Sequence, residues 1–219
     1  MDRKEIRKLV KSHFWQLLKK EGYKKYKSSM FTKISKDNVL QIVYLEFGSI
    51  GFSCRIALQP LYIIKHIHGI NLALGNRLTR FKMVGGEFWS YKDNPMEGIK
   101  KFEYLLFKNG LPWLEEYSNP RSIIKFIEKK EFNEYGLNLF WDYFQKQYQG
   151  FSHLYIGEID KGVNCLRKMI GEISEDAVDF MHVYKKNIEK FIETIENKPE
   201  LLPQILNDVI EDNKKEMKL

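Results

Sequence analysis

Residues 39–59 read VLQIVYLEFGSIGFSCRIALQ and predict two strands joined by a tight turn. The first of them, residues 39–47, is rich in β-branched and aromatic side chains, which pack well on a pleated sheet. After the turn at residues 48–51, apolar and more polar side chains alternate from Phe52 to Gln59. A period of two is typical of a half-buried strand, so we expect the polar face of this strand to line a groove.

Further strands are expected on both sides of this pair. A strand at residues 28–34 is followed by Ser35-Lys36-Asp37-Asn38, which has the chemistry of a hairpin turn. A second hairpin is predicted from a strand at 77–83, the Gly85-Gly86 turn and a strand at 88–91. Together these segments predict an antiparallel sheet of four to five strands.

Helical spacing of apolar residues precedes and follows the sheet. It predicts an amphipathic helix over residues 2–21, with Gly22 as its stop. Asn94-Pro95-Met96-Glu97 has the residues of a helix start, and Gly110 is the expected end of that helix. Asn119-Pro120 repeats the same start signal, so another helix is expected to follow it.

The segments at 132–149 and 157–170 resemble one tetratricopeptide-type helical hairpin. In such a hairpin small residues lie where the two helices touch, and Gly150 and Gly162 have the required spacing. The neighbouring 34-residue windows do not repeat the pattern. We therefore expect a single hairpin and no tandem array.

These elements predict an α+β fold, with an N-terminal helix, the sheet, helices on one side of it and a helical C-terminal part. We divide the chain into an α+β domain at 1–130 and a helical extension at 131–219. In the extension, Ser174 is the expected cap of a long helix and Pro199 opens a final one. Residues 213–219 are expected to be frayed.

The composition is that of an ordinary globular protein. The 219 residues are 43% hydrophobic, enough to bury a core without a metal or a disulfide. Cys54 and Cys165 lack a CxxC spacing, which favours a reducing compartment. The start of the chain has no secretion signal, and no apolar run approaches the roughly 18 residues of a membrane span. We expect a cytoplasmic protein without a membrane segment or a cofactor.

Positive charge is concentrated at the start of the chain. Residues 1–27 hold ten Lys/Arg and three Asp/Glu, a balance of +7, whereas residues 156–219 hold ten and fourteen, a balance of −4. On a helical projection, one sector of the first helix is basic with an indole in its middle. The candidate partner- or anion-binding residues are Lys4, Arg7, Lys8, Lys11, Trp15 and Lys19.

This basic sector has two interpretations. The lysines would neutralise an anion while the indole stacks on a base or anchors a protein contact. Alternatively, the face is simply solvated and Trp15 packs against another part of the same fold. Tyr23-Lys24-Lys25-Tyr26-Lys27 extends the surface, either as a binding loop or as a polar connection into an edge strand.

Two other groups of residues are weaker candidates. A groove for an anion or a peptide would form if the following residues shared one sheet face: Arg55, Gln59, Arg77, Arg80, Trp89 and Tyr91. His66 and His68 would place two imidazoles on one side of a strand, but no third or fourth metal ligand is identifiable, so no metal site is predicted. The sequence also lacks GxxxxGK[ST], GxGxxG, HExxH and GxSxG motifs, and no catalytic residue is predicted.

Several segments together resemble a bacterial family, the domain of unknown function 4304. They are Gly22-Tyr23-Lys24-Lys25, Met30-Phe31-Thr32, Val39-Leu40-Gln41-Ile42, Trp89 and Gly110-Leu111-Pro112-Trp113-Leu114. The resemblance covers residues 1–130 and implies an α+β domain with no assigned activity. The association of some members with bacterial conflict systems implies a toxin-neutralising role. The basic start of this chain departs from the acidic surfaces with which inhibitors of nucleases imitate nucleic acid.

The leading hypothesis is a non-enzymatic cytoplasmic protein that binds another protein, in a toxin-neutralising or defence context. One alternative is a nucleic-acid-binding protein that uses the basic face of the first helix. The other is an unrecognised hydrolase or metal enzyme that uses His66 and His68.

Overall fold

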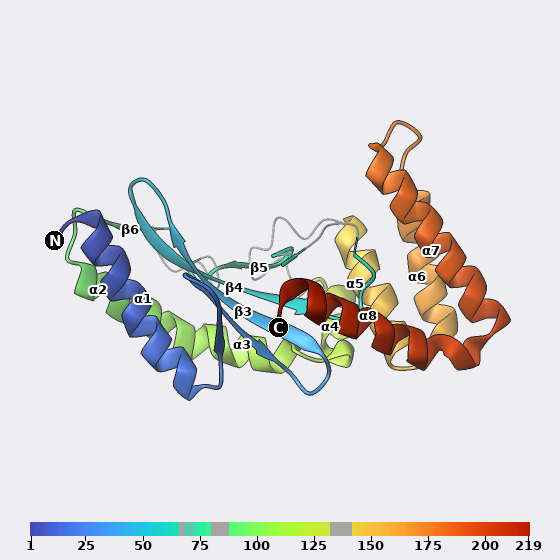
Figure 1. Cartoon of the computed structure of the whole chain (residues 1–219), viewed down its shortest axis with the longest axis horizontal. Helices are drawn as coiled ribbons and strands as arrows, with labels where there is room; N and C mark the ends of the chain where they lie inside the picture. Colours follow the sequence, from blue (N-terminus) through green and yellow to red (C-terminus); the bar gives the residue numbers. More distant parts are fainter. Residues whose placement is uncertain (66–68, 71, 80–87, 132–141) are drawn as a thin grey trace.

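The computed structural model describes residues 1–65, 69–70, 72–79, 88–131 and 142–219. It has the predicted α+β fold, in which an N-terminal helix precedes an antiparallel sheet and further helices follow (Figure 1). The first half contains α1 (Arg3–Lys20), β1 (Lys24–Lys27), β2 (Met30–Ile34), β3 (Val39–Phe47), β4 (Gly51–Pro60), β5 (Leu74–Arg77) and β6 (Trp89–Ser90). The second half contains α2 (Pro95–Leu105), η1 (Leu106–Gly110), α3 (Leu111–Tyr117), α4 (Pro120–Glu128), α5 (Asp142–Tyr155), α6 (Ile159–Gly171), α7 (Asp179–Asn197), η3 (Pro199–Leu201) and α8 (Leu202–Met217).

The sheet has the order β1-β2-β3-β4-β5, and β6 also pairs with β4. Arg77 of β5 lies opposite Arg55, and Trp89 of β6 lies opposite Phe52. Because β5 and β6 both pair antiparallel with β4, they run in the same direction. They therefore do not form a hairpin with each other. The predicted second hairpin is described only at its ends, where Arg77 is the last residue of β5 and Trp89–Ser90 pair with the ten-residue β4. Residues 80–87 of that prediction lie outside the described residues.

β4 is buried on both of its faces, not on one as its alternating sequence predicted. Even Ser53 and Gln59 are buried, at 0% and 3% exposure. On one face Ile56 lies near Gly110, at the junction of η1 and α3. On the other face the Gln59 side chain lies 4.0 Å from Met217 Sδ in α8. At Gln59 this face is therefore covered by α8, which the local sequence could not show.

Gly110 does not end a helix as predicted. It closes the π-helical turn η1, and the chain continues directly into α3 with Gly110 at φ −69°. A Cβ atom at Gly110 would lie 2.8 Å from Leu78 Cδ2, so the glycine allows the helix to approach the end of the sheet closely. The Asn94 and Asn119 caps, by contrast, lie where the sequence predicted them, each accepting a backbone hydrogen bond in the first turn.

α5 and α6 form the predicted helical hairpin with glycines at the contact. A Cβ atom on Gly150 would lie 2.9 Å from Leu166 Cδ2, and one on Gly162 would lie 2.5 Å from Leu154 Cγ. Only a hydrogen at these positions lets the helices approach so closely. Residues 132–141, the first part of the predicted 132–149 helix, lie outside the described residues.

The C-terminal helices differ from expectation at both ends. Ser174 does not cap a helix: its hydroxyl donates to Asp176 at 2.5 Å, and α7 begins only at Asp179. Residues 213–219 are packed, not frayed. Asn213 is 6% exposed, and its side-chain amide donates to the carbonyl oxygens of Leu61 and Ile63 at 2.7 and 3.0 Å.

α8 therefore returns the C-terminus to the sheet, as Figure 1 shows. The buried apolar residues form one continuous core cluster that extends from Ile6 in α1 to Met217 in α8. The helical part from residue 131 onward thus shares its core with the α+β part.

We expect Gly162→Ala to destabilise the protein by about 1–2 kcal/mol, because the cost of overpacking against Leu154 exceeds the roughly 1 kcal/mol gained in helix propensity. Gly171→Ala in the same helix is the matched control, since nothing lies within 4 Å of the added methyl group. Urea unfolding of both variants measures the difference. Equal stabilities of the two variants would contradict the close approach at Gly162.

Candidate binding surface

α1 is fixed at its start by a capping box. The Asp2 carboxylate accepts a hydrogen bond from the Glu5 amide, and the Glu5 carboxylate accepts one from the Asp2 amide, both at 2.8 Å. These carboxylates also complement the positive end of the helix dipole. The buried stripe of α1 consists of Ile6, Val10, Phe14 and Leu18. Lys4, Lys8 and Lys19 of the basic sector consequently point away from this stripe.

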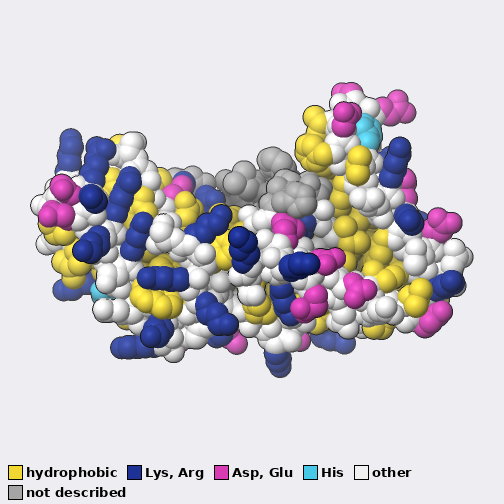
Figure 2. All heavy atoms as spheres, viewed as in Figure 1, with side chains coloured by type: hydrophobic (Ala, Val, Ile, Leu, Met, Phe, Trp, Pro, Cys, Tyr) yellow, Lys and Arg dark blue, Asp and Glu magenta, His cyan; other side chains and the backbone are white. Residues whose placement is uncertain are grey.

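Three of the predicted residues, Lys4, Lys8 and Lys19, are exposed. Within the part of the chain that the structure describes, none of the three has an ion-pair partner. Figure 2 shows Lys and Arg gathered over α1 and the neighbouring strands, whereas Asp and Glu lie mainly over the later helices. These three lysines are available to an external partner.

Two other predicted residues, Arg7 and Lys11, make contacts inside the molecule. Arg7 Nε donates to the Tyr91 hydroxyl at 3.3 Å, and Arg7 Nη2 donates to the Gly48 carbonyl at 3.4 Å. The Lys11 ammonium lies 5.4 Å from the centre of the Phe47 ring, close enough for a cation–π contact. Arg7 and Lys11 thus connect α1 to the hairpin between β3 and β4.

Trp15 packs against its own fold. Its ring stacks on Phe31 of β2 with a centroid separation of 5.9 Å and an angle of 10° between the planes. The Lys25 ammonium lies 4.9 Å from the indole centroid. This is the packing alternative considered for Trp15, although the contacting elements are β1 and β2, not the C-terminal helices. A base cannot stack on the face of the indole that Phe31 occupies.

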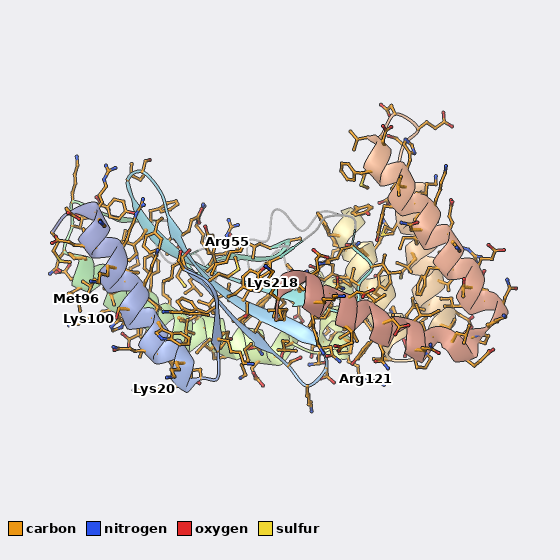
Figure 3. All side chains as sticks on the ribbon, in the orientation of Figure 1. Lys20, Arg55, Met96, Lys100, Arg121 and Lys218 are labelled. Carbon is orange, nitrogen blue, oxygen red and sulfur yellow. The ribbon has the colours of Figure 1, made fainter. Side chains whose placement is uncertain are left out.

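α2 packs beside α1 and also exposes side chains suited to an interface. His13 Nε2 and Glu103 Oε2 are 2.7 Å apart, which connects the two helices. Met96 and Tyr104 on α2 are 40% and 57% exposed. Figure 3 shows Met96 and Lys100 beside α1. Methionine and tyrosine are enriched at protein–protein interfaces. We call the exposed set Lys4, Lys8, Lys19, Met96 and Tyr104 the α1–α2 surface.

Residues 24–27, for which the sequence left a binding loop or a polar connection open, form the edge strand β1. Lys24 pairs with Thr32 and Lys25 with Phe31 of β2. Lys24, Lys25 and Lys27 are exposed. Lysines on an edge strand oppose its pairing with the strand of another molecule. The basic surface therefore extends from α1 to the edge of the sheet.

The residues proposed for a groove do not share one face. The Trp89 indole donates to the Asn94 carbonyl at 3.0 Å and packs against Gly98 of α2, so it lies on the face covered by helices. Tyr91, bonded to Arg7 of α1, lies on the same side. Arg55 follows Cys54 and precedes Ile56 in a strand whose side chains alternate, and it points to the opposite face.

On that opposite face the predicted arginines meet an acidic residue that the sequence analysis missed. Arg77 Nε and Nη2 donate to the two carboxylate oxygens of Glu46 at 2.7 and 2.8 Å. The hydrogen bonds to Arg77 hold the pKa of Glu46 below its ordinary value of 4.5. The register of β3 to β5, which places Glu46 and Arg77 on either side of β4, could not be read from local patterns. Arg80 lies outside the described residues.

His66 and His68 also lie outside the described residues, so the structure does not test them as metal ligands. In the described ranges, no group of three or more His, Cys, Asp and Glu side chains could hold a metal ion.

Burial raises the pKa of the Cys54 and Cys165 thiols, which disfavours their reactive thiolate form.

Comparisons with protein-family models, curated proteins and solved structures find no match to this chain. The resemblance to the domain of unknown function 4304 family therefore stays a prediction. None of the described helices is both long enough and apolar enough to cross a membrane.

The Glu46–Arg77 pair gives the stability of the protein a defined pH dependence. A carboxyl whose pKa is lower in the folded state stabilises that state above its unfolded pKa, and this contribution is lost as the pH falls through the folded pKa. We expect Glu46→Gln to lower the free energy of unfolding by about 1–2 kcal/mol at pH 7, where one charged hydrogen-bond partner of Arg77 is removed at a partly exposed site.

The difference between Glu46→Gln and the wild type should be similar at pH 7 and pH 5 and smaller at pH 3, below the ordinary pKa of 4.5. Urea unfolding at pH 7, 5 and 3 measures it. A difference that stays constant over this range would show that the charge of Glu46 does not contribute.

Proposed function

We propose that this protein is a non-enzymatic cytoplasmic binding protein, and that the α1–α2 surface binds an acidic face of another protein. The observation that carries the proposal is the exposure on α1 of Lys4, Lys8 and Lys19, which have no acidic partner among the described residues, together with the exposure of Met96 and Tyr104 on the adjoining helix α2. Apolar and aromatic contacts anchor an interface, and the surrounding charges select the partner and accelerate association.

The packing of Trp15 favours a protein partner over nucleic acid. Binding of single strands commonly depends on aromatic rings that are free to stack on bases. Trp15 has Phe31 stacked on one side and the Lys25 ammonium near its ring, so it offers no free platform. The lysines alone would support only a salt-sensitive, sequence-independent contact with phosphates.

The biological setting in this proposal rests on the family resemblance alone. A partner in a bacterial conflict system would be a toxin with an acidic face, complementary to the α1–α2 surface. Because the surface would suit any protein with an acidic face, a toxin included, the partner is sought by capture from a whole extract.

We expect Lys4→Glu/Lys8→Glu to abolish capture of the partner from a cytosolic extract of the source organism. The matched control is Lys186→Glu/Lys190→Glu on α7, where both lysines are exposed, four residues apart and changed by the same charge. A protein retained by the wild type and the control but lost from the first variant is then purified. Its association rate at 50 mM salt should fall at least about tenfold in that variant.

Two outcomes would reject the proposal. One is that no protein distinguishes the two double variants. The other concerns nucleic acid. If the wild-type chain itself binds a labelled 20-nucleotide RNA or DNA at 50 mM salt, and Lys4→Glu/Lys8→Glu abolishes that binding, the same surface would serve nucleic acid and not a protein.

A further inference from the structure

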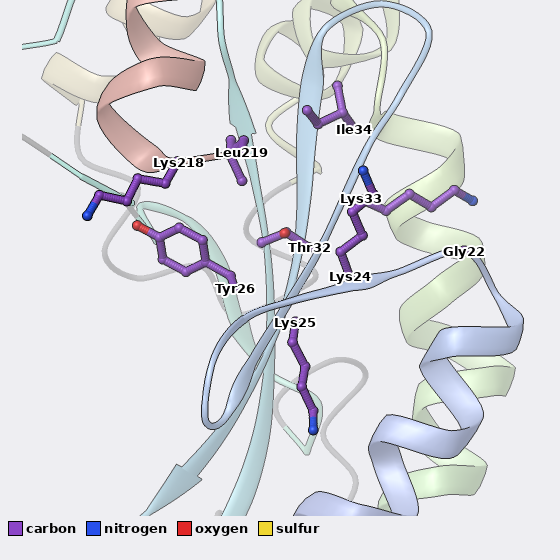
Figure 4. A pocket seen from close by; sticks show the side chains of 9 residues that line it. All are labelled: Gly22, Lys24, Lys25, Tyr26, Thr32, Lys33, Ile34, Lys218 and Leu219. Atoms are coloured by element: carbon purple, nitrogen blue, oxygen red, sulfur yellow. The ribbon is translucent and has the colours of Figure 1, made fainter.

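A cavity of about 380 Å³ lies between the edge of the sheet and Lys218 and Leu219, which follow α8. Its walls come from segments that are almost two hundred residues apart in the chain (Figure 4). The lining residues are Gly22, Lys24, Lys25, Tyr26, Thr32, Lys33, Ile34, Lys218 and Leu219. A volume of this size suits a small organic molecule.

Strand geometry decides which of the lining charges serve the cavity. Lys33 lines it with its carbon chain, but the Lys33 ammonium is 3.7 Å from Glu115 of α3, on the helix-covered face. Lys25 likewise directs its ammonium toward Trp15, and in Figure 4 it extends away from Tyr26 and Lys218. Lys24 and Lys218 remain as the cations of the cavity.

Four polar groups of the cavity have no partner among the described residues. Thr32 is 4% exposed, yet among the described residues none forms a hydrogen bond with its hydroxyl. The same is true of the Tyr26 hydroxyl, which points toward Lys218 in Figure 4. Neither Lys24 nor Lys218 has an ion-pair partner in the described part of the chain. The hydroxyls of Thr32 and Tyr26 are therefore available to a ligand or to water in the cavity.

The end of α8, which positions Lys218 and Leu219, is held in place by several bonds. The Glu216 carboxylate accepts a hydrogen bond from the Gly69 amide at 2.5 Å and lies 3.3 Å from the Lys65 ammonium. Asn213 is bonded to the loop after β4, as described above. Lys218 adopts a left-handed conformation with φ 54°, which turns the chain back over the sheet edge. A ligand would therefore meet a cavity that is largely formed beforehand, which lowers the entropic cost of binding.

We propose that this cavity binds a small organic anion that has an apolar or aromatic body and a phosphate, sulfonate or carboxylate head. Lys24 and Lys218 neutralise the head, the hydroxyls of Tyr26 and Thr32 bond to it, and Ile34 and Leu219 contact the body. The site is separate from the α1–α2 surface and goes beyond the proposed function, because its ligand is a small molecule.

The residues that line the cavity explain why the ligand needs both an anionic head and an apolar body. Two ammonium groups and two hydroxyls would favour any anion, including inorganic phosphate. The apolar side chains of Ile34 and Leu219 and the ring of Tyr26 would contact only a ligand that carries an apolar group. Both parts together distinguish this cavity from an ordinary cluster of surface lysines.

The test titrates the full chain with 1-naphthyl phosphate, with inorganic phosphate as the head alone and 1-naphthol as the body alone. Calorimetry should give one site for 1-naphthyl phosphate, with an affinity at least about tenfold above that of either fragment. Lys24→Glu and Lys218→Glu should each weaken binding about tenfold or more. Thr32→Val, which keeps the volume but removes the hydroxyl, should weaken it several-fold.

Lys20→Glu is the control, since Lys20 is exposed at the end of α1 and does not line the cavity. Unchanged binding in this variant, and in Lys4→Glu/Lys8→Glu, supports the assignment independently of the proposed function. Equal affinities for 1-naphthyl phosphate and inorganic phosphate would overturn it. So would an equal loss in Lys20→Glu and Lys218→Glu, because binding would then follow net charge. Circular dichroism of each variant confirms that it is folded.

Discussion

Burial of the β3–β4 pair on both of its faces is the constraint on which the rest of the structure depends. A buried polar side chain in such a pair must find its partners in the covering elements. Gln41 of β3 accepts a hydrogen bond from the Tyr23 hydroxyl at 2.8 Å and donates to the Ser118 hydroxyl at 3.1 Å. These two bonds tie the end of α1 and the end of α3 to the centre of the sheet. On the other face, the bonds of Asn213 give α8 a fixed position over the loop that follows β4.

The cavity described above lies at the periphery of this arrangement. In the described part of the chain, helices cover one face of the central strands, and α8 approaches the other face near Gln59. The cavity beside β1 exists only because the C-terminus folds back onto a sheet edge formed by residues 24–34. Its chemistry therefore depends on two segments that no local reading of the sequence connects.

The success of the sequence predictions follows the range of the interactions involved. α1, the turn before β3 and the Asn-Pro helix starts are specified by neighbouring residues, and they were predicted closely. The glycine contact of α5 and α6 was also predicted, because both positions lie within one hairpin. Gly110, Ser174 and residues 213–219 were misjudged, since their roles depend on Leu78, on the start of α7 and on the loop after β4.

The candidate site was predicted only in part for the same reason. The exposure of Lys4 and Lys8 follows from the helical period of α1 alone. The internal contacts of Arg7, Lys11 and Trp15 depend on strands that pair far along the chain, so the same period could not separate them from the exposed lysines. The cavity beside β1 gave no signal in the sequence, because Lys218 and Thr32 are brought together only by tertiary packing.

The separation of charge along the molecule has a consequence for how it approaches other bodies. Basic groups cover the end formed by α1 and β1, and acidic groups predominate over the later helices (Figure 2). A molecule with such a dipole experiences a torque in the field of a charged object. At physiological ionic strength this field decays over about 8 Å, so the torque acts only in the last moments before collision. The protein would then approach an anionic object with α1 turned toward it and the C-terminal helices turned away.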